Sequence, residues 1–172
     1  MSKTLSYQKF ELGKSISQAE IDFFNKYGFI HYKNFITPER AQTVSAAIDE
    51  KQKEIIAKGI QKINGIPIKF GEDENSEPII QRFPYTSQNV PEVAKLYDDP
   101  RLENLKELVP DAGYPRRIGL NEKDGVVANH YVNTGNSNYK QLGWHTDVAR
   151  DFLLGKGMYP MLNVGIYLTD SN

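Results

Sequence analysis

The chain has 172 residues, which is enough for one domain with a hydrophobic core of its own. Its formal net charge is −1, so the charge balance favours neither nucleic acid nor an anionic membrane as a partner. It has no cysteine, which excludes disulfides and thiolate ligands, and no apolar leader at its N-terminus, so we expect a cytoplasmic protein.

A first helix is predicted after Ser17. The side chains of Ser17 and Glu20 have the spacing of a capping box, in which each satisfies a backbone N–H at the start of a helix. The apolar face of this helix would consist of Ile21, Phe24 and Tyr27. Gly28 is the kind of residue that commonly ends a helix, and Phe29–Tyr32 then predicts a short strand.

A second, longer helix is predicted after Thr37, which can cap the first turn while Pro38 occupies the first helical position. Its apolar stripe would consist of Val44, Ile48 and Ile55. Gly59 would end this helix. The other positions are rich in Lys, Glu and Gln, which indicates an outer helix with a solvated face.

The segment that follows is acidic at first and then helical. Gly71–Glu77 predicts an exposed loop, and two short helices are expected near Glu92–Tyr97 and Arg101–Leu108. From Pro115 onward the pattern changes to extended runs separated by turns rich in Gly and Asn. These runs are Arg116–Leu120, Val126–Val132, Leu142–Asp147 and Met161–Thr169.

Helices therefore come first in this sequence and strands come later. We predict one domain, with a helical wrap at about residues 15–110 and a β-rich core at about residues 115–172. In the last extended run, apolar residues alternate with Asn163, Gly165 and Tyr167, which is typical of a strand with one packed face.

His145 and Asp147 form the pattern that bears most directly on chemistry. Residues two apart on an extended strand point to the same face, with Cα atoms roughly 6.5–7 Å apart. One imidazole and one carboxylate are two of the three ligands that bind non-haem Fe(II). The third ligand would be a second histidine, but no histidine follows His145 in the sequence. The alternative is a surface histidine beside an acidic residue, because short patterns also arise by chance.

Three separated regions carry a family resemblance, in the correct order. Phe23–Ile30 and Lys33–Glu39 resemble the N-terminal signature of the phytanoyl-CoA dioxygenase family, where a helix ends at a glycine, a strand follows and a turn opens the next helix. Gly143–Asp147 resembles the iron-binding strand of that family. Ile166–Asn172 resembles the strand that leads into the turn after it.

This resemblance implies a mainly β fold, a double-stranded β-helix (jelly roll) wrapped by N-terminal helices. It implies an Fe(II)- and 2-oxoglutarate-dependent dioxygenase that uses O2, releases succinate and CO2, and usually hydroxylates its substrate. By position, His145 and Asp147 would be metal ligands. Related halogenases carry a small residue in place of this carboxylate, so Asp147 favours hydroxylation or another oxygen-derived oxidation.

The co-substrate would be held by the strand before the iron strand. Asn129, Tyr131 and Asn133 alternate onto one face there, and family members use amide side chains at about this place. Amides suit the task because they donate to carboxylate oxygens without adding a charge. The alternative is that residues 133–136 simply form a turn. Asn163 could also line the pocket.

Other polar and aromatic residues have two possible roles. Arg117 could bind an anionic substrate, or it could be ordinary surface charge at the start of a strand. Trp144 and Phe152 could shield the site from water, or they could belong to the core. His31 and His130 are expected to be structural, with ring nitrogens satisfied by ordinary hydrogen bonds.

In the family, a second histidine and an arginine that anchors 2-oxoglutarate come after the position of Asn172. The chain is therefore expected to be the N-terminal portion of a longer, jelly-roll oxygenase and to be inactive alone. Two alternatives remain open: a non-catalytic jelly-roll module that binds a ligand or partner, and a cupin-like metal hydrolase or isomerase. The expected partner is a small molecule, with no nucleic acid and no membrane.

Overall fold

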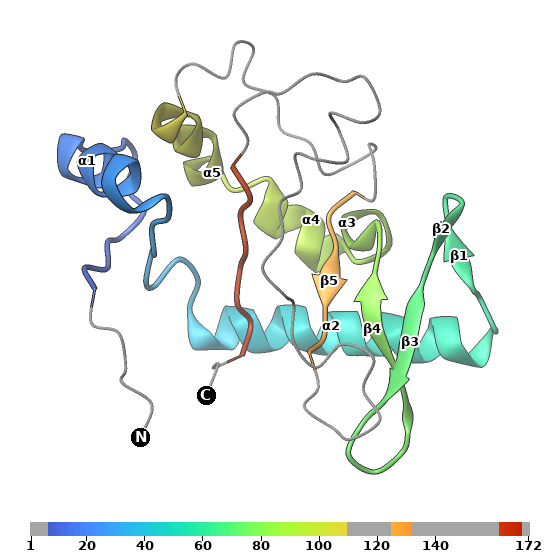
Figure 1. The fold of residues 1–172 in the computed structure, drawn as a ribbon. Coiled ribbons are helices and arrows are strands. Elements are labelled where there is room, and N and C mark those ends of the chain that lie inside the picture. The colour runs from blue at the N-terminus through green and yellow to red at the C-terminus, as the bar shows by residue number, and fades with distance from the viewer. Residues whose placement is uncertain (1–6, 110–124, 132–161, 170–172) are drawn as a thin grey trace.

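The computed structural model describes residues 7–109, 125–131 and 162–169 (Figure 1). In these ranges the elements are, in chain order, α1 (Gln18–Tyr27), α2 (Pro38–Ala57), β1 (Lys62–Ile63), β2 (Ile66–Pro67), β3 (Lys69–Glu72), β4 (Pro78–Phe83), α3 (Thr86–Asn89), α4 (Pro91–Tyr97), α5 (Arg101–Asn104), the 3₁₀ helix η1 (Leu105–Leu108) and β5 (Ala128–Asn129). None of the helices in these ranges is long and apolar enough to cross a lipid bilayer.

Helix α1 begins and ends as its sequence predicts. The backbone N–H of Glu20 donates to Ser17 Oγ at 3.3 Å, and the Glu20 carboxylate accepts from the Ser17 N–H at 2.7 Å, which completes the capping box. Gly28 has a φ of 73° and its N–H donates to the carbonyl of Phe24 at 2.7 Å. The predicted apolar face is wrong at Tyr27, whose side chain is 52% exposed.

Helix α2 also has the predicted start and stripe. Thr37 Oγ1 accepts from the N–H of Arg40 at 3.2 Å, and Pro38 is the first helical residue. The predicted stripe is buried, and Gln52, one turn after Ile48, is buried with it. The helix ends at Ala57, and Gly59 follows with a φ of +63°.

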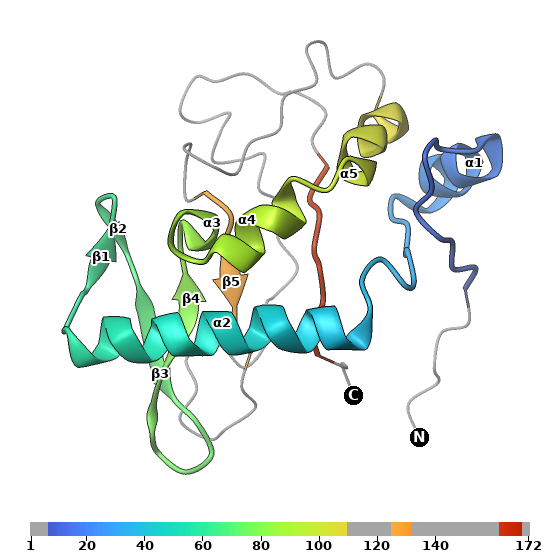
Figure 2. The same ribbon diagram turned by 180° about the vertical axis from the view of Figure 1, so that it is seen from behind.

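The strands form two small antiparallel sheets, one of β1 and β2 and one in the order β3-β4-β5. Figure 2 shows α2 lying across one face of the three-stranded sheet. Residues 73–77 form the tip of the β3–β4 hairpin, where Asp73 Oδ1 accepts from the N–H groups of Asn75 and Glu77. The predicted loop is wrong at Gly71 and Glu72, which belong to β3 and pair with β4. The flanking strands were not predicted, because the acidic and turn-forming residues of the tip dominate the local pattern.

Buried side chains gather in two clusters. The main core lies between α2, the strands and α4, and consists of Val44, Ile48, Ile55, Ile68, Ile80, Phe83, Val90, Val93 and Leu96. The second core lies around α1, α5 and η1, and consists of Leu12, Ile16, Leu105 and Leu108. In both views α1 and α5 lie together at the end of the molecule opposite β1 and β2 (Figures 1 and 2).

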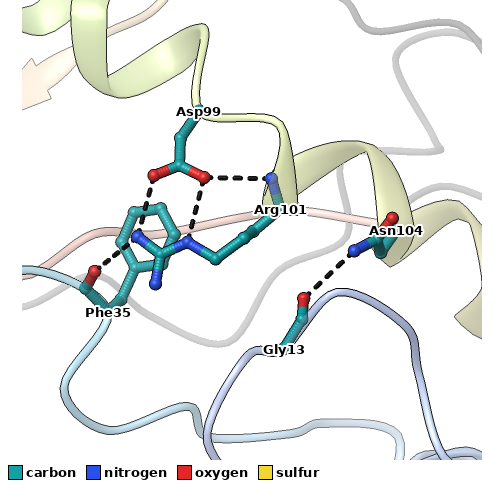
Figure 3. A network of polar contacts seen from close by, with 5 residues as sticks. All are labelled: Gly13, Phe35, Asp99, Arg101 and Asn104. Atoms are coloured by element: carbon teal, nitrogen blue, oxygen red, sulfur yellow. Dashed lines mark hydrogen bonds and ion pairs between the residues drawn. The ribbon is translucent and has the colours of Figure 1, made fainter.

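Polar contacts attach the second core to its surroundings (Figure 3). The Arg101 guanidinium donates to both oxygens of Asp99, at 3.0 and 2.8 Å, and to the carbonyl of Phe35 at 2.8 Å. Its charge also lies 4.4 Å from the centre of the Phe35 ring. Asn104 donates to the carbonyl of Gly13 at 3.1 Å. The hydrogen bonds from Arg101 hold the pKa of the Asp99 carboxyl below its usual value.

A parallel bridge pairs the N-terminal segment with the chain after α1. The N–H of Phe10 donates to the carbonyl of His31, and the N–H of Lys33 donates to the carbonyl of Phe10, both at 2.9 Å.

Burial and the nearby Glu20 carboxylate raise the pKa of the Tyr32 hydroxyl, so this phenol stays neutral within the second core.

Three predicted strands are shorter than expected or lack strand pairing. Phe29–Tyr32 makes only the bridge at Tyr32, and Asn34 turns the chain with a φ of 56°. In the run that begins at Val126, pairing is limited to β5. Residues 162–167 have no strand pairing, and Val164 is exposed although the alternation predicts it to be packed. The predicted runs 116–120 and 142–147 lie outside the described residues.

Candidate functional site

Only some of the predicted site residues lie in the described ranges. Asn129 and Tyr131 lie on and just after β5, and Asn163 lies in segment 162–169. The predicted metal ligands, together with the other predicted co-substrate and substrate residues, lie outside the described residues. They are His145, Asp147, Asn133, Arg117 and Trp144.

The position of β5 is fixed by Thr86, a fully buried residue at the start of α3. Its hydroxyl donates to the carbonyl of Phe83 at 2.6 Å and accepts from the N–H of Ala128 at 3.0 Å. Its own N–H donates to the carbonyl of Val126 at 2.8 Å. One threonine therefore satisfies the backbone on both sides of the β4–β5 contact.

The turn that leads into β5 accepts only glycine. Gly125 has a φ of +65°, and a Cβ atom there would lie 2.6 Å from Tyr85 Cδ1 and 3.1 Å from Tyr85 Cα. The Tyr85 backbone is itself left-handed, with a φ of 54°. Because the close approach involves backbone as well as ring atoms, neither residue can move aside cheaply. This constraint is not visible in the sequence pattern.

Asn129 shares a face of the sheet with two basic residues. Arg82 on β4 lies directly opposite Asn129 on β5 and opposite Lys69 on β3. Directly opposite residues point to the same side of a sheet, with Cβ atoms about 4.5–5.5 Å apart. The next pair, Phe83 and Ala128, packs on the other side, in and against the main core. Asn129 and Arg82 therefore lie on the face away from α2.

A β-bulge shapes this face. Lys69 opposes Arg82 whereas Phe70 opposes Ile80, so Gln81 is the extra residue on β4. A Cβ atom at Gly71 would lie 2.5 Å from Gln81 Cδ, so the side chain of Gln81 lies over this glycine. The Gln81 carbonyl accepts from the N–H of His130 at 2.9 Å, which extends the contact between β4 and β5.

This face offers donors that suit an anion. An amide donates to carboxylate oxygens, and a guanidinium can bind a carboxylate through two parallel hydrogen bonds. The sequence pattern predicts a binding role for Asn129, but none was predicted for Arg82. The signal that could have found Arg82 is a basic residue between Ile79-Ile80 and Phe83, because a charged side chain is seldom half-buried without a polar partner.

The other predicted residues, Tyr131 and Asn163, lie beyond the end of β5 and in a separate segment of the chain. Tyr131 is 49% exposed beyond β5. Asn163 is exposed in segment 162–169, which contacts the second core through Leu162 and the main core through Leu168.

The two described histidines have different surroundings. His31 Nδ1 lies 2.9 Å from the hydroxyl of Tyr7, an ordinary hydrogen bond of the kind expected for a structural histidine. His130 is exposed, and its backbone N–H donates to the carbonyl of Gln81. Across residues 7–109, 125–131 and 162–169, no three His, Cys, Asp or Glu side chains gather as they would around a metal ion.

Comparison of the chain with protein-family models, with curated proteins and with solved structures found no match in any of the three.

Proposed function

We propose that this chain carries the site of an Fe(II)- and 2-oxoglutarate-dependent dioxygenase that hydroxylates a small molecule and releases succinate and CO2. The observation that carries the proposal is the pair His145 and Asp147 in the strand-like run Leu142–Asp147. An imidazole and a carboxylate two residues apart on a strand are two of the three donors that non-haem Fe(II) prefers.

The donor chemistry fits the metal. Fe(II) would be held by one nitrogen of His145 and one carboxylate oxygen of Asp147. When bound, iron and 2-oxoglutarate would supply the electrons that activate O2, which no side chain can supply. The protein's part is to orient the co-substrate and to exclude water.

The sheet face that carries Asn129 and Arg82 supports the part of the proposal that concerns 2-oxoglutarate. The Asn129 amide would donate to a carboxylate oxygen of 2-oxoglutarate, and Arg82 would add positive potential on the same face. Tyr131 and Asn133 would extend this face, and Trp144 would limit the access of water. Arg117 would attract an anionic group of the substrate.

The experiment is an anaerobic titration of the 172-residue protein with Fe(II) and 2-oxoglutarate, followed by the visible charge-transfer band of the chelate. We expect weak binding, because two protein ligands hold the metal less firmly than three. The titration is therefore repeated with added imidazole, which can take the place of a third nitrogen ligand. We expect the band to strengthen with imidazole.

Three variants make the result specific. His145→Ala and Asp147→Ala should each abolish the band, and His31→Ala should retain it, since His31 pairs with Tyr7. A band that survives His145→Ala, or no band with or without imidazole, contradicts the proposal. If Fe(II) binds through both residues but 2-oxoglutarate adds no band, the metal hydrolase or isomerase is favoured instead. Absence of metal binding favours the non-catalytic jelly-roll module.

A further inference from the structure

The β1–β2 hairpin has a two-residue turn of defined geometry. Ile63 pairs with Ile66, so the turn consists of Asn64 and Gly65. Their φ values are 49° and 81°, both left-handed, which is the type I′ turn that suits the twist of a hairpin. Asn64 and Gly65 are also the only Asn-Gly pair in the whole sequence.

The side chain of Asn64 attaches this hairpin to helix α3. Its Nδ2 donates to Oε1 of Gln88 at 2.9 Å. Both Asn64 and Gly65 are exposed to solvent. Ile63 packs against the main core from its edge, and this amide-to-amide hydrogen bond links the turn of the hairpin to α3.

We propose that Asn64 is a site of spontaneous deamidation and that the contact with Gln88 sets its rate. The backbone nitrogen of Gly65 attacks Cγ of Asn64, and a C–N bond forms. Nδ2 takes up the proton released from the attacking nitrogen and leaves as ammonia, which gives a succinimide. Water then opens the ring at either carbonyl and leaves aspartate or isoaspartate at position 64.

The residue types and their contacts explain both the reactivity and its restraint. Gly65 has no side chain to hinder the attack on Cγ. The carboxamide, however, is held against α3 by Gln88, and the turn fixes the backbone in the left-handed region. The Asn64 side chain must leave Gln88 before its Cγ can reach the Gly65 nitrogen. Local opening of the hairpin is therefore the step that controls the reaction.

The product changes how the hairpin is held. A carboxylate at position 64 cannot donate to Gln88 Oε1 as the amide does. Isoaspartate also adds a backbone carbon to a two-residue turn, which disturbs the pairing of Ile63 with Ile66. Deamidation would thus loosen β1 and β2 from α3 and expose the edge of the main core. This inference does not depend on the proposed function.

The test is incubation of the folded full chain at mildly alkaline pH, followed by tryptic digestion and mass spectrometry. Cleavage after Lys62 and Lys69 isolates Asn64 in the peptide Ile63–Lys69. We expect this peptide to gain the mass that accompanies replacement of an amide by an acid. In Gln88→Ala the gain should be about fivefold faster, the factor that corresponds to one ordinary hydrogen bond.

Two controls distinguish loss of the Asn64–Gln88 hydrogen bond from a general loosening of the protein. Gln61→Ala removes a nearby surface amide that bonds to the Gly59 carbonyl and should leave the rate unchanged. Asn75, at the tip of the β3–β4 hairpin, should react at the same rate in the wild type and in Gln88→Ala. No mass gain at Asn64, an equal rate in Gln88→Ala, or equal acceleration at Asn75 would overturn the proposal.

Discussion

The two cores of this protein are built in different ways. The main core joins a 20-residue helix to a sheet and contains side chains with no exposed surface, such as Val44, Ile80 and Phe83. The second core has four buried side chains, from short elements and irregular segments. Its surroundings are fastened by polar contacts such as Arg101 with Asp99 and Phe35.

This difference has a physical consequence. Truncation of a side chain in an apolar core causes the largest decrease in the free energy of unfolding, because a cavity remains. In a cluster held by hydrogen bonds and ion pairs, each substitution lowers the free energy of unfolding less, but the stability depends on pH and salt. The main core should therefore be vulnerable to truncation, and the second core to solution conditions.

The largest effect is expected at Phe83, which is fully buried in the main core. Phe83→Ala should lower the free energy of unfolding by about 3–5 kcal/mol, because the ring leaves a cavity that the neighbouring residues only partly fill. Urea denaturation monitored by circular dichroism measures this change. Tyr167→Ala, at a side chain that is 80% exposed, is the control and should stay within about 0.5 kcal/mol of wild type.

A smaller loss is expected for Gly125→Ala. The left-handed backbone alone costs about 1–2 kcal/mol for a residue with a Cβ atom, and the approach to Tyr85 adds to this. We expect faster hydrogen exchange at the amides of Ala128 and His130, since β5 would lose its fixed entry. Unchanged exchange at these two amides would show that the Gly125 turn does not position β5.

At the start of α1, next to Ile16 of the second core, Ser17→Ala should lower the free energy of unfolding by about 1 kcal/mol, because it removes a side-chain acceptor for the first turn. Hydrogen exchange in the first turn of α1 should rise, whereas exchange in α2 should not. Thr37→Ala removes the matching cap of α2 and is the natural comparison. If both variants accelerate exchange equally in both helices, the two cores do not open separately.

The smallest effect concerns pH. The pKa of Asp99 is lowered in the folded protein by its hydrogen bonds with Arg101, so its contribution to stability is fully present above the unfolded pKa of about 4. It is lost as the pH falls through the lowered folded value. Such partly exposed pairs contribute only about 0.2–1 kcal/mol to stability. The effect is therefore measured as the difference in unfolding midpoint between wild type and Asp99→Asn. The difference in unfolding midpoint should shrink as the pH is lowered from 6 to 3, within the range set by these pKa values.

The elements that the sequence predicts well are those with local signals. The capping box at Ser17, the Thr37-Pro38 start and the stripe of α2 each depend on residues within a few turns of one another, and each is confirmed. The short helix near Glu92–Tyr97 is confirmed as α4, and the one near Arg101–Leu108 as α5 followed by η1.

Features that depend on distant partners were not predictable in this way. The pairing of Arg82 with Asn129 joins residues from two separate parts of the chain, and the restriction at Gly125 arises from Tyr85 across the β4–β5 contact. Of the candidate site, Asn129 is placed on the face that it shares with Arg82. The roles of His145 and Asp147 stay predictions.

The contact of Leu162 with the second core bears on how the protein folds. Leu12 and Leu162 belong to the same cluster although they come from far apart in the described sequence, and Leu168 then reaches the main core. Contacts between residues far apart in sequence slow folding, because a long loop must close before they form. Helix α1 would therefore leave the ribosome well before Leu162, and the second core cannot complete its packing until this distant part of the chain has been made.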